Sequence, residues 1–135
     1  MVRFEKLAIP ETIYAFVDAT TAAEYTNGTF GTISSDVFTA GAGNFCIMQV
    51  EWGDKAYSDE FTIPAGAHAR VADMAKGEGL VINITANELP SSFAVGDVLK
   101  SDSNGKLVIN SAQSAKGYKV IEITDYGARA VVALA

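Results

Sequence analysis

The sequence predicts an all-β protein, and three observations support that prediction. Apolar and polar residues alternate with a period of two in several short segments. Twelve glycines separate these segments, and the segments recur about ten to fifteen residues apart, a spacing typical of all-β domains. Of the 135 residues, 49% are hydrophobic and only 19% are charged, which excludes an intrinsically disordered chain. A chain of this length is expected to form one domain with its own core.

In the first part of the chain, strands are expected over residues 12–17, 28–33 and 45–52. The first is rich in aromatic and β-branched residues, and the second follows an Asn-Gly turn signal. In the third, every even position from Cys46 to Trp52 is apolar, so one face is expected to be buried over its whole length. Residues 80–85 alternate in the same way and predict a fourth strand.

Two consecutive hairpins are expected in the last third of the chain. Residues 96–100 and 106–109 flank a polar turn that ends in Asn-Gly, a pair that tolerates the positive φ of a tight turn. Residues 118–124 and 128–134 flank the second turn. At most short helices are expected, and the one candidate covers residues 67–76. Its apolar residues fall on one helical face, and a glycine at position 77 ends it.

The sequence offers little for catalysis. His68 is the only histidine, so histidine-based metal sets and Ser-His-Asp triads have at most one candidate member. It has no acidic residue within four positions, which predicts an ordinary surface or loop residue. Cys46 is the only cysteine, so no intrachain disulfide can form, and its apolar neighbours predict a buried thiol. We expect no catalytic residue, no cofactor and no metal site, and therefore a protein that is not an enzyme.

Two short motifs look like ligand loops but are better explained as turns. Residues 102–105, Asp-Ser-Asn-Gly, resemble the start of a calcium loop but lack its further oxygen ligands and distal Glu. Residues 41–44 contain a G-x-G, yet the Lys and Ser/Thr of a phosphate loop do not follow. Both motifs therefore predict turn chemistry.

The charge pattern excludes nucleic acid as a partner. The formal net charge is -6, and the ten Lys and Arg residues are scattered singly. Nucleic-acid binding needs grouped cations that neutralise phosphates, so no nucleic-acid partner is expected.

The longest apolar run, residues 130–135, is far shorter than the roughly 20 residues of a membrane-spanning helix, and no membrane partner is expected. The first residues lack the apolar stretch of a secretory signal.

Residues 1–10 are expected to form an extended N-terminal arm, and residues 11–135 a single β-rich domain. Apolar and polar residues alternate in the arm at Val2 and Phe4 and, after a slip at Glu5-Lys6, at Leu7 and Ile9. Pro10 restricts the residue before it to extended conformations. Such an arm can add an edge strand to a neighbouring sheet, or it can pack along its own domain. The sequence leaves both alternatives open.

Four segments in the last part of the chain resemble a known family. They are Phe-Ala-Val-Gly-Asp-Val-Leu at 93–99, Ser-Asn-Gly-Lys-Leu at 103–107, Lys-Val-Ile-Glu-Ile at 119–123 and Gly-Ala-Arg-Ala-Val-Val at 127–132. A Gly-Asp before a strand, an Asn-Gly-Lys turn and a closing Val-rich strand after a glycine resemble the head decoration (capsid cement) proteins of tailed bacteriophages. The preceding residues match the family only in being β-rich with an N-terminal arm.

This resemblance implies a compact β-barrel or β-tulip-like fold and a role in the virion. Family members bind the outside of an assembled capsid, commonly as trimers at three-fold or quasi-three-fold positions. The implied partners are the major capsid protein and further copies of the chain. The implied location is the capsid exterior, with the host cytoplasm before assembly. The family has no catalytic residues to transfer.

The expected capsid contact is the N-terminal arm, which would pair its backbone with a capsid strand. Phe4 is the expected anchor, because a buried aromatic contributes the most area. The full set of expected contact residues is Val2, Arg3, Phe4, Lys6, Leu7 and Ile9.

An alternative function remains: a stand-alone β-sandwich binding module or a tail-associated virion protein that binds carbohydrate or a receptor. Carbohydrate sites usually gather several exposed aromatics and amides on one face. Trp52, Tyr57 and Phe61 form the only such cluster in the sequence, and Trp52 falls on the expected buried face of its strand.

Overall fold

The computed structural model describes residues 1–5, 15–48, 62–112 and 116–134. Within these residues the chain is all-β, as predicted, and its helical segments are two short 3-10 helices. The strands are β1 (Val2–Phe4), β2 (Phe16–Thr21), β3 (Tyr25–Thr26), β4 (Phe30–Ser34), β5 (Val37–Ala40), β6 (Phe45–Ile47), β7 (Thr62–Ile63), β8 (His68–Asp73), β9 (Val81–Thr85), β10 (Val98–Ser101), β11 (Leu107–Ile109), β12 (Gly117–Thr124) and β13 (Gly127–Ala133). The 3-10 helices are η2 (Met74–Gly77) and η3 (Ala86–Glu88).

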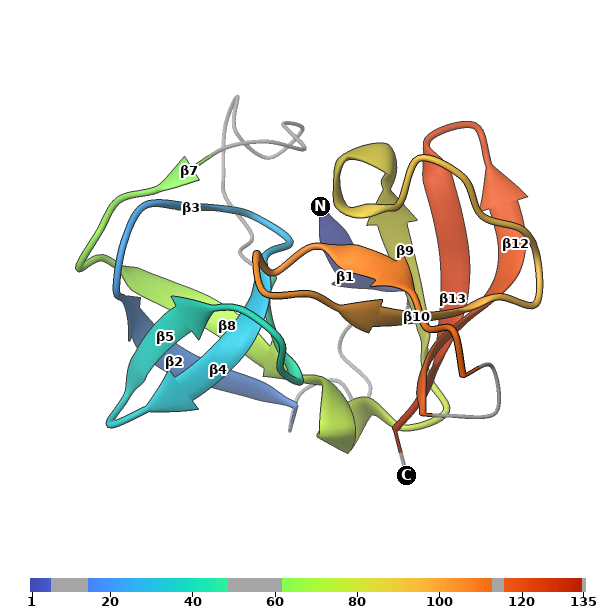
Figure 1. The fold of residues 1–135 in the computed structure, drawn as a ribbon. Helices are drawn as coiled ribbons and strands as arrows, with labels where there is room; N and C mark the ends of the chain where they lie inside the picture. The colour runs from blue at the N-terminus through green and yellow to red at the C-terminus, as the bar shows by residue number, and fades with distance from the viewer. Residues whose placement is uncertain (6–14, 49–61, 113–115, 135) are drawn as a thin grey trace.

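The first half of the chain closes into a five-stranded barrel with the strand order β2-β5-β4-β6-β8 (Figure 1). Strands β2 and β5 run parallel, and the other neighbours in the barrel are antiparallel. Closure leaves the barrel without the unpaired edges on which other chains can add strands. Strands β3 and β7 form a separate two-stranded ribbon.

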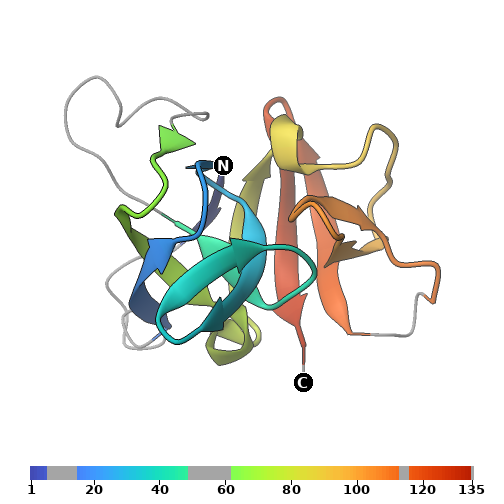
Figure 2. The ribbon, with the colours of Figure 1, turned by 60° about the vertical axis from the view of Figure 1, so that its left-hand side comes forward.

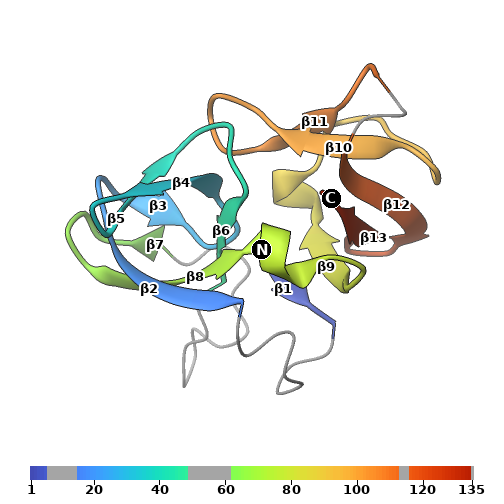
Figure 3. The same ribbon diagram turned by 90° about the horizontal axis from the view of Figure 1, so that it is seen from below.

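The last five strands and the N-terminal strand β1 form a six-stranded antiparallel sheet with the order β1-β9-β13-β12-β10-β11, which stands beside the barrel (Figure 2). Both predicted hairpins are confirmed as β10–β11 and β12–β13. Seen from below, β1 and β11 lie at opposite edges of the sheet (Figure 3). The two edge strands have three residues each.

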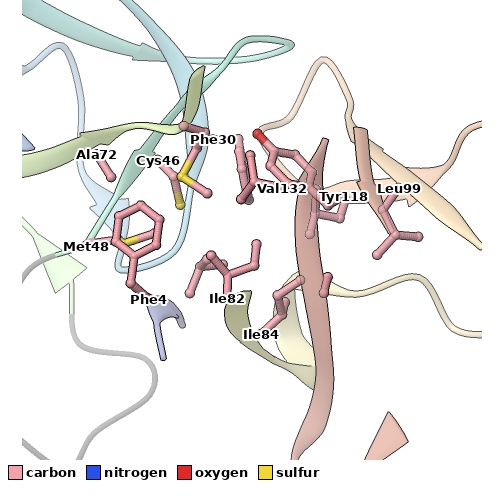
Figure 4. Packing of buried hydrophobic residues seen from close by; sticks show 14 of the residues in the cluster. Phe4, Phe30, Cys46, Met48, Ala72, Ile82, Ile84, Leu99, Tyr118 and Val132 are labelled. Atoms are coloured by element: carbon pink, nitrogen blue, oxygen red, sulfur yellow. The ribbon is translucent and has the colours of Figure 1, made fainter. Parts of the chain in front are cut away.

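The barrel and the sheet share one hydrophobic core. Phe30 of β4, Cys46 of β6 and Ala72 of β8 face a buried cluster that includes Ile82 and Tyr118 of the sheet (Figure 4). A smaller second cluster fills the barrel itself and consists of Ala19, Phe38, Ile47, Ile63, Ala69 and Val71. The two parts of the chain are therefore one packed unit.

Strand β6 serves both clusters. Cys46 points into the shared core, and the next residue, Ile47, points into the barrel. Both are fully buried. This explains why the sequence around them is apolar on both faces, since successive side chains of a strand point to opposite sides.

The helix expected over residues 67–76 is wrong. Residues 68–73 form strand β8, and the 3-10 helix η2 contains only the last part of the segment and ends at Gly77, as expected. In β8, Ala69 and Val71 are buried while His68 and Arg70 are exposed, which is the period of a strand. Pairing with β2 and β6 closes the barrel and overrides the local helical pattern.

The N-terminal residues form part of the domain. Strand β1 pairs with β9, so that Val2 lies opposite Ile84 and Phe4 opposite Ile82. Phe4 is only 2% exposed and makes an edge-to-face contact with Phe16, with ring centroids 5.9 Å apart. Residues 1–5 therefore pack along their own domain, the second of the two alternatives.

This placement corrects the expected docking arm. Val2 and Phe4 are buried in the protein's own core, so they are not available as docking side chains, and Phe4 is not an exposed anchor. Arg3 is exposed, because its side chain points to the opposite face of β1. Lys6, Leu7 and Ile9 lie outside the described residues, as do Trp52, Tyr57 and Phe61.

We predict that Phe4→Ala lowers the free energy of unfolding by about 3–5 kcal/mol, because it removes a ring from the shared core. Urea denaturation measures the change. Arg3→Ala is the control on the same strand and should change the stability by less than about 0.5 kcal/mol. A Phe4→Ala protein as stable as the wild type would show that the N-terminal strand does not belong to the core.

Candidate functional site

Cys46 is a core residue, as predicted. Its thiol is fully buried beside the sheet and donates to the carbonyl oxygen of Ile47 at 3.7 Å. Burial raises the pKa of this thiol well above its usual value, and the negative charge of Glu88 raises it further. A thiol that stays protonated is a poor nucleophile and a poor metal ligand.

His68 is an exposed residue at the start of β8, in line with the prediction. Its Nδ1 lies 3.3 Å from Oδ2 of Asp18 on the neighbouring strand β2. Within the described parts of the chain, no group of three His, Cys, Asp or Glu side chains could hold a metal ion. The His68–Asp18 pair is an exposed cross-strand contact of the barrel.

The loop at residues 102–105 is a turn, as predicted. Oδ1 of Asp102 accepts hydrogen bonds from the backbone N–H groups of Asn104, at 2.8 Å, and Lys106, at 3.0 Å. Gly105 has a φ of 77°, a conformation that glycine adopts without strain. The carboxylate that could begin a calcium loop is therefore used to close the turn.

Glu88 is a buried carboxylate whose exposed fraction is 2%. It forms an ion pair with the amino group of Met1 and accepts a hydrogen bond from the hydroxyl of Thr85 at 2.9 Å. Nζ of Lys106 lies 3.8 Å from its other oxygen. Because both oxygens face cationic groups, Glu88 is compensated within the fold and ties β1 to the end of β9.

An ion-pair network crosses the outer face of the sheet, the face that points away from the barrel. Nε of Arg129 lies 2.7 Å from a carboxylate oxygen of Glu5, and its Nη1 lies 2.6 Å from Glu122. These two hydrogen bonds raise the pKa of the Arg129 guanidinium further above its usual value. The network connects β13 with β12 and with the residue that follows β1.

A hollow with both apolar and polar lining residues lies at the end of the sheet where β12 turns into β13. We call it the hairpin groove. Its volume is about 620 Å³. Its apolar lining includes Leu89, Pro90, Phe93, Ile123 and Tyr126, and its polar lining includes Asn87, Ser91, Thr124 and Asp125. The Ile123 side chain is 51% exposed and that of Tyr126 is 80% exposed. Exposed apolar side chains that gather around one hollow are typical of a binding surface.

Val95 extends the apolar surface towards the middle of β12. It is 60% exposed, and the backbone N–H of the next residue, Gly96, donates to the carbonyl oxygen of Val120 at 2.8 Å. This bond fixes the loop that carries Phe93 and Val95 against β12. The apolar residues of the groove therefore stand on an ordered support.

A second hollow, which we call the outer-face hollow, lies on the outer face of β1 and β9. Its volume is about 450 Å³. The polar side chains of Arg3, Asn83, Thr85 and Thr124 line it together with the exposed ring of Tyr126. Met1, Ile84 and Ala128 complete the lining.

Sequence reasoning missed both hollows, although some of their residues carried a signal. Tyr126 stands between Asp125 and Gly127 in a hairpin turn, where a large aromatic has no core to enter. Ile123 follows a bulge between Val120 and Glu122, after which its side chain lies opposite Ala128 where β12 is exposed. Nothing in the sequence indicates that residues 89–93 return to lie beside this hairpin.

Comparison with known proteins identifies no relative. No family model matches the chain, and neither a curated protein nor a solved structure matches it. In the described parts of the chain, no helix has the length and apolar character needed to cross a membrane.

Tyr118 gives a test of the core around Cys46. Its hydroxyl is buried without a hydrogen-bond partner in the described residues, and burial, followed by the nearby Cys46 and Asp73, raises its pKa well above the usual value. We predict that Tyr118→Phe leaves stability at pH 7 unchanged or raises it by up to about 2 kcal/mol, because the mutation removes an unsatisfied polar group.

The pH dependence of stability follows from the same shift. The folded protein keeps the proton of Tyr118 to a higher pH than the unfolded chain does. The free energy of unfolding is therefore unaffected by this group below pH ~10, where the unfolded tyrosine begins to ionise, and it falls as the pH rises further. Each pH unit above this point costs the wild type about 1.4 kcal/mol through Tyr118. Tyr118→Phe removes this part of the loss, whereas the part that comes from the raised pKa of Cys46 remains. Urea denaturation at neutral and alkaline pH measures the difference, with the exposed Tyr126→Phe as the control. Equal alkaline losses in wild type and Tyr118→Phe would contradict the assignment.

Proposed function

We propose that the protein is a virion structural protein that binds the outer surface of an assembled phage capsid and stabilises the lattice. It acts as a homotrimer at three-fold or quasi-three-fold positions, and its partner is the major capsid protein. The resemblance of residues 93–132 to head decoration proteins supports this proposal, and so does the all-β fold.

The hairpin groove is the observation on which the proposal depends. The segments that carry the family resemblance, residues 93–99, 119–123 and 127–132, contain or border the groove. Three of the most exposed large hydrophobic side chains, those of Val95, Ile123 and Tyr126, belong to this part of the surface. A protein-binding role explains why these side chains are left uncovered in an otherwise well-packed domain.

The energetics suit a lattice protein. A ligand that binds only the assembled shell stabilises that state by mass action. Many copies bound at equivalent sites then make a modest contact effective, and a trimer engages several capsid subunits at once. A net charge of -6 helps to keep free copies soluble before they bind.

The hairpin groove replaces the N-terminal arm as the proposed principal contact. Val2 and Phe4 are used within the domain, whereas the groove offers an aromatic and an aliphatic side chain at a solvent-exposed site. Such residues are typical of the centre of an interface, where they contribute most of the binding energy.

The test is co-sedimentation with expanded capsids of the phage that encodes the chain. We predict that wild-type protein pellets with capsids and that Ile123→Glu weakens binding at least about tenfold, because it places a charge in the apolar contact. Light scattering of the isolated chain tests whether the trimer forms in solution. A trimer that forms only on the capsid would be seen in an image reconstruction of decorated capsids as a three-fold cluster of density.

Ile109→Glu is the matched control. Ile109 is also a partly exposed strand isoleucine (38%), but it lies on β11 at the far edge of the sheet. The Ile109→Glu protein should bind capsids as tightly as the wild type. Failure of the wild type to pellet would contradict the proposed function, and an Ile123→Glu protein that binds as tightly as the wild type would exclude the groove as the contact.

A further inference from the structure

We propose that the outer-face hollow binds a carboxylate-bearing sugar, such as a uronic acid unit of a polysaccharide. This inference does not rest on the proposed capsid role, because Arg3 and Asn83 line the outer-face hollow and not the hairpin groove, although the two hollows share Thr124 and Tyr126. Its volume, about 450 Å³, falls in the range of small-ligand sites.

The sheet register brings the polar residues of the hollow into adjacent rows. Arg3 lies opposite Asn83 and Asn83 lies opposite Arg129 on the next strand. Thr85 lies opposite Gly127, and Gly127 lies opposite Thr124. Directly opposed side chains, such as those of Arg3 and Asn83, are close enough to contact one ligand together. Thr124 lies three strands away from Arg3 but lines the same hollow.

Gly127 keeps the second row open. A Cβ at this position would lie 1.9 Å from the carbonyl oxygen of Ile84, so no side chain fits there. The backbone N–H of Ala86 donates to the carbonyl oxygen of Tyr126 at 2.9 Å, which anchors the turn to the end of β9. The Tyr126 ring, 80% exposed, therefore stands at the rim of a preformed hollow.

Arg3 is the cation of the hollow that is free to bind a ligand. Its neighbour in the row, Arg129, is already held by Glu5 and Glu122 through hydrogen bonds of 2.6–3.0 Å. Arg3 is exposed and has no ion pair or hydrogen bond to another side chain in the described residues. A guanidinium in this position presents a planar pair of N–H donors that matches a carboxylate.

The other free groups match the remainder of a sugar. The amide of Asn83 and the hydroxyl of Thr124 have no side-chain hydrogen bonds in the described part of the chain, and an amide and a hydroxyl can each both donate to and accept from sugar hydroxyls. The Tyr126 ring offers an apolar face for the C–H side of the sugar ring. Together these groups recognise a hydroxylated ring that carries one negative charge.

The experiment titrates the ¹⁵N-labelled full chain with galacturonate, galactose and acetate, and follows the backbone amide shifts. We expect galacturonate to bind with a millimolar dissociation constant and to shift amides of β1, β9 and the β12–β13 turn. Galactose, which lacks the carboxylate, and acetate, which lacks the ring, should each bind at least about tenfold more weakly.

Two variants separate the contributions of charge and ring. Arg3→Met should reduce galacturonate binding to the level of galactose, and Tyr126→Ala should weaken the binding of both sugars. Lys100→Met is the control, because it removes an exposed cation from β10, outside the hollow. Both variants are expected to stay folded, since Arg3 and Tyr126 are exposed, and their amide spectra report this directly.

The proposal is overturned by any of three results. The first is the absence of a saturable shift of the lining amides at up to about 50 mM galacturonate. The second is equal binding of galacturonate and acetate, and the third is an Arg3→Met protein that binds galacturonate as tightly as the wild type. The capsid test remains distinct, since Ile123→Glu changes the hairpin groove and leaves Arg3 and Asn83 in place.

Discussion

The contact between barrel and sheet is the constraint on which the rest of the structure depends. Phe30 of the barrel packs against Tyr118 of the sheet with ring centroids 5.3 Å apart, and Phe4 of β1 meets Phe16 of β2. A closed five-stranded barrel has a small interior, and here six buried residues form its cluster. The larger cluster forms only when the barrel covers the inner face of the sheet, so neither part buries its apolar surface alone.

This shared core decides which surfaces remain for partners. The barrel has no open edge, and the two edges of the sheet, β1 and β11, are too short to invite further strands. The inner face of the sheet is covered by the barrel. Among the surfaces that remain are the outer face of the sheet, with its polar rows, and the end of the sheet beyond the barrel, where Ile123 and Tyr126 are exposed. The two hollows occupy these two places.

The parts of the fold that the sequence predicted are those set by local chemistry. The hairpin around Asp102 could be predicted because one carboxylate and one glycine determine the turn. The β12–β13 hairpin could be predicted because two β-rich runs flank a short turn. Strand β8 was mistaken for a helix because its small residues favour a helix locally, while barrel closure is a long-range effect. The pairing of Val2 with Ile84 joins residues far apart in the sequence and left no local signal. The hollows depend on such long-range contacts, and their composition could be seen only once the register was known.

Hydrogen exchange in Phe30→Ala tests most directly whether barrel and sheet form one cooperative unit. The substitution removes a buried ring from the shared core, at a cost of about 3–5 kcal/mol. If the core is shared, the slowest amides of β4 and β8 in the barrel and of β9 and β13 in the sheet should lose the same free energy of opening. Loss of protection in the barrel strands alone, with the sheet amides unchanged, would show that the two parts fold independently and would contradict this account.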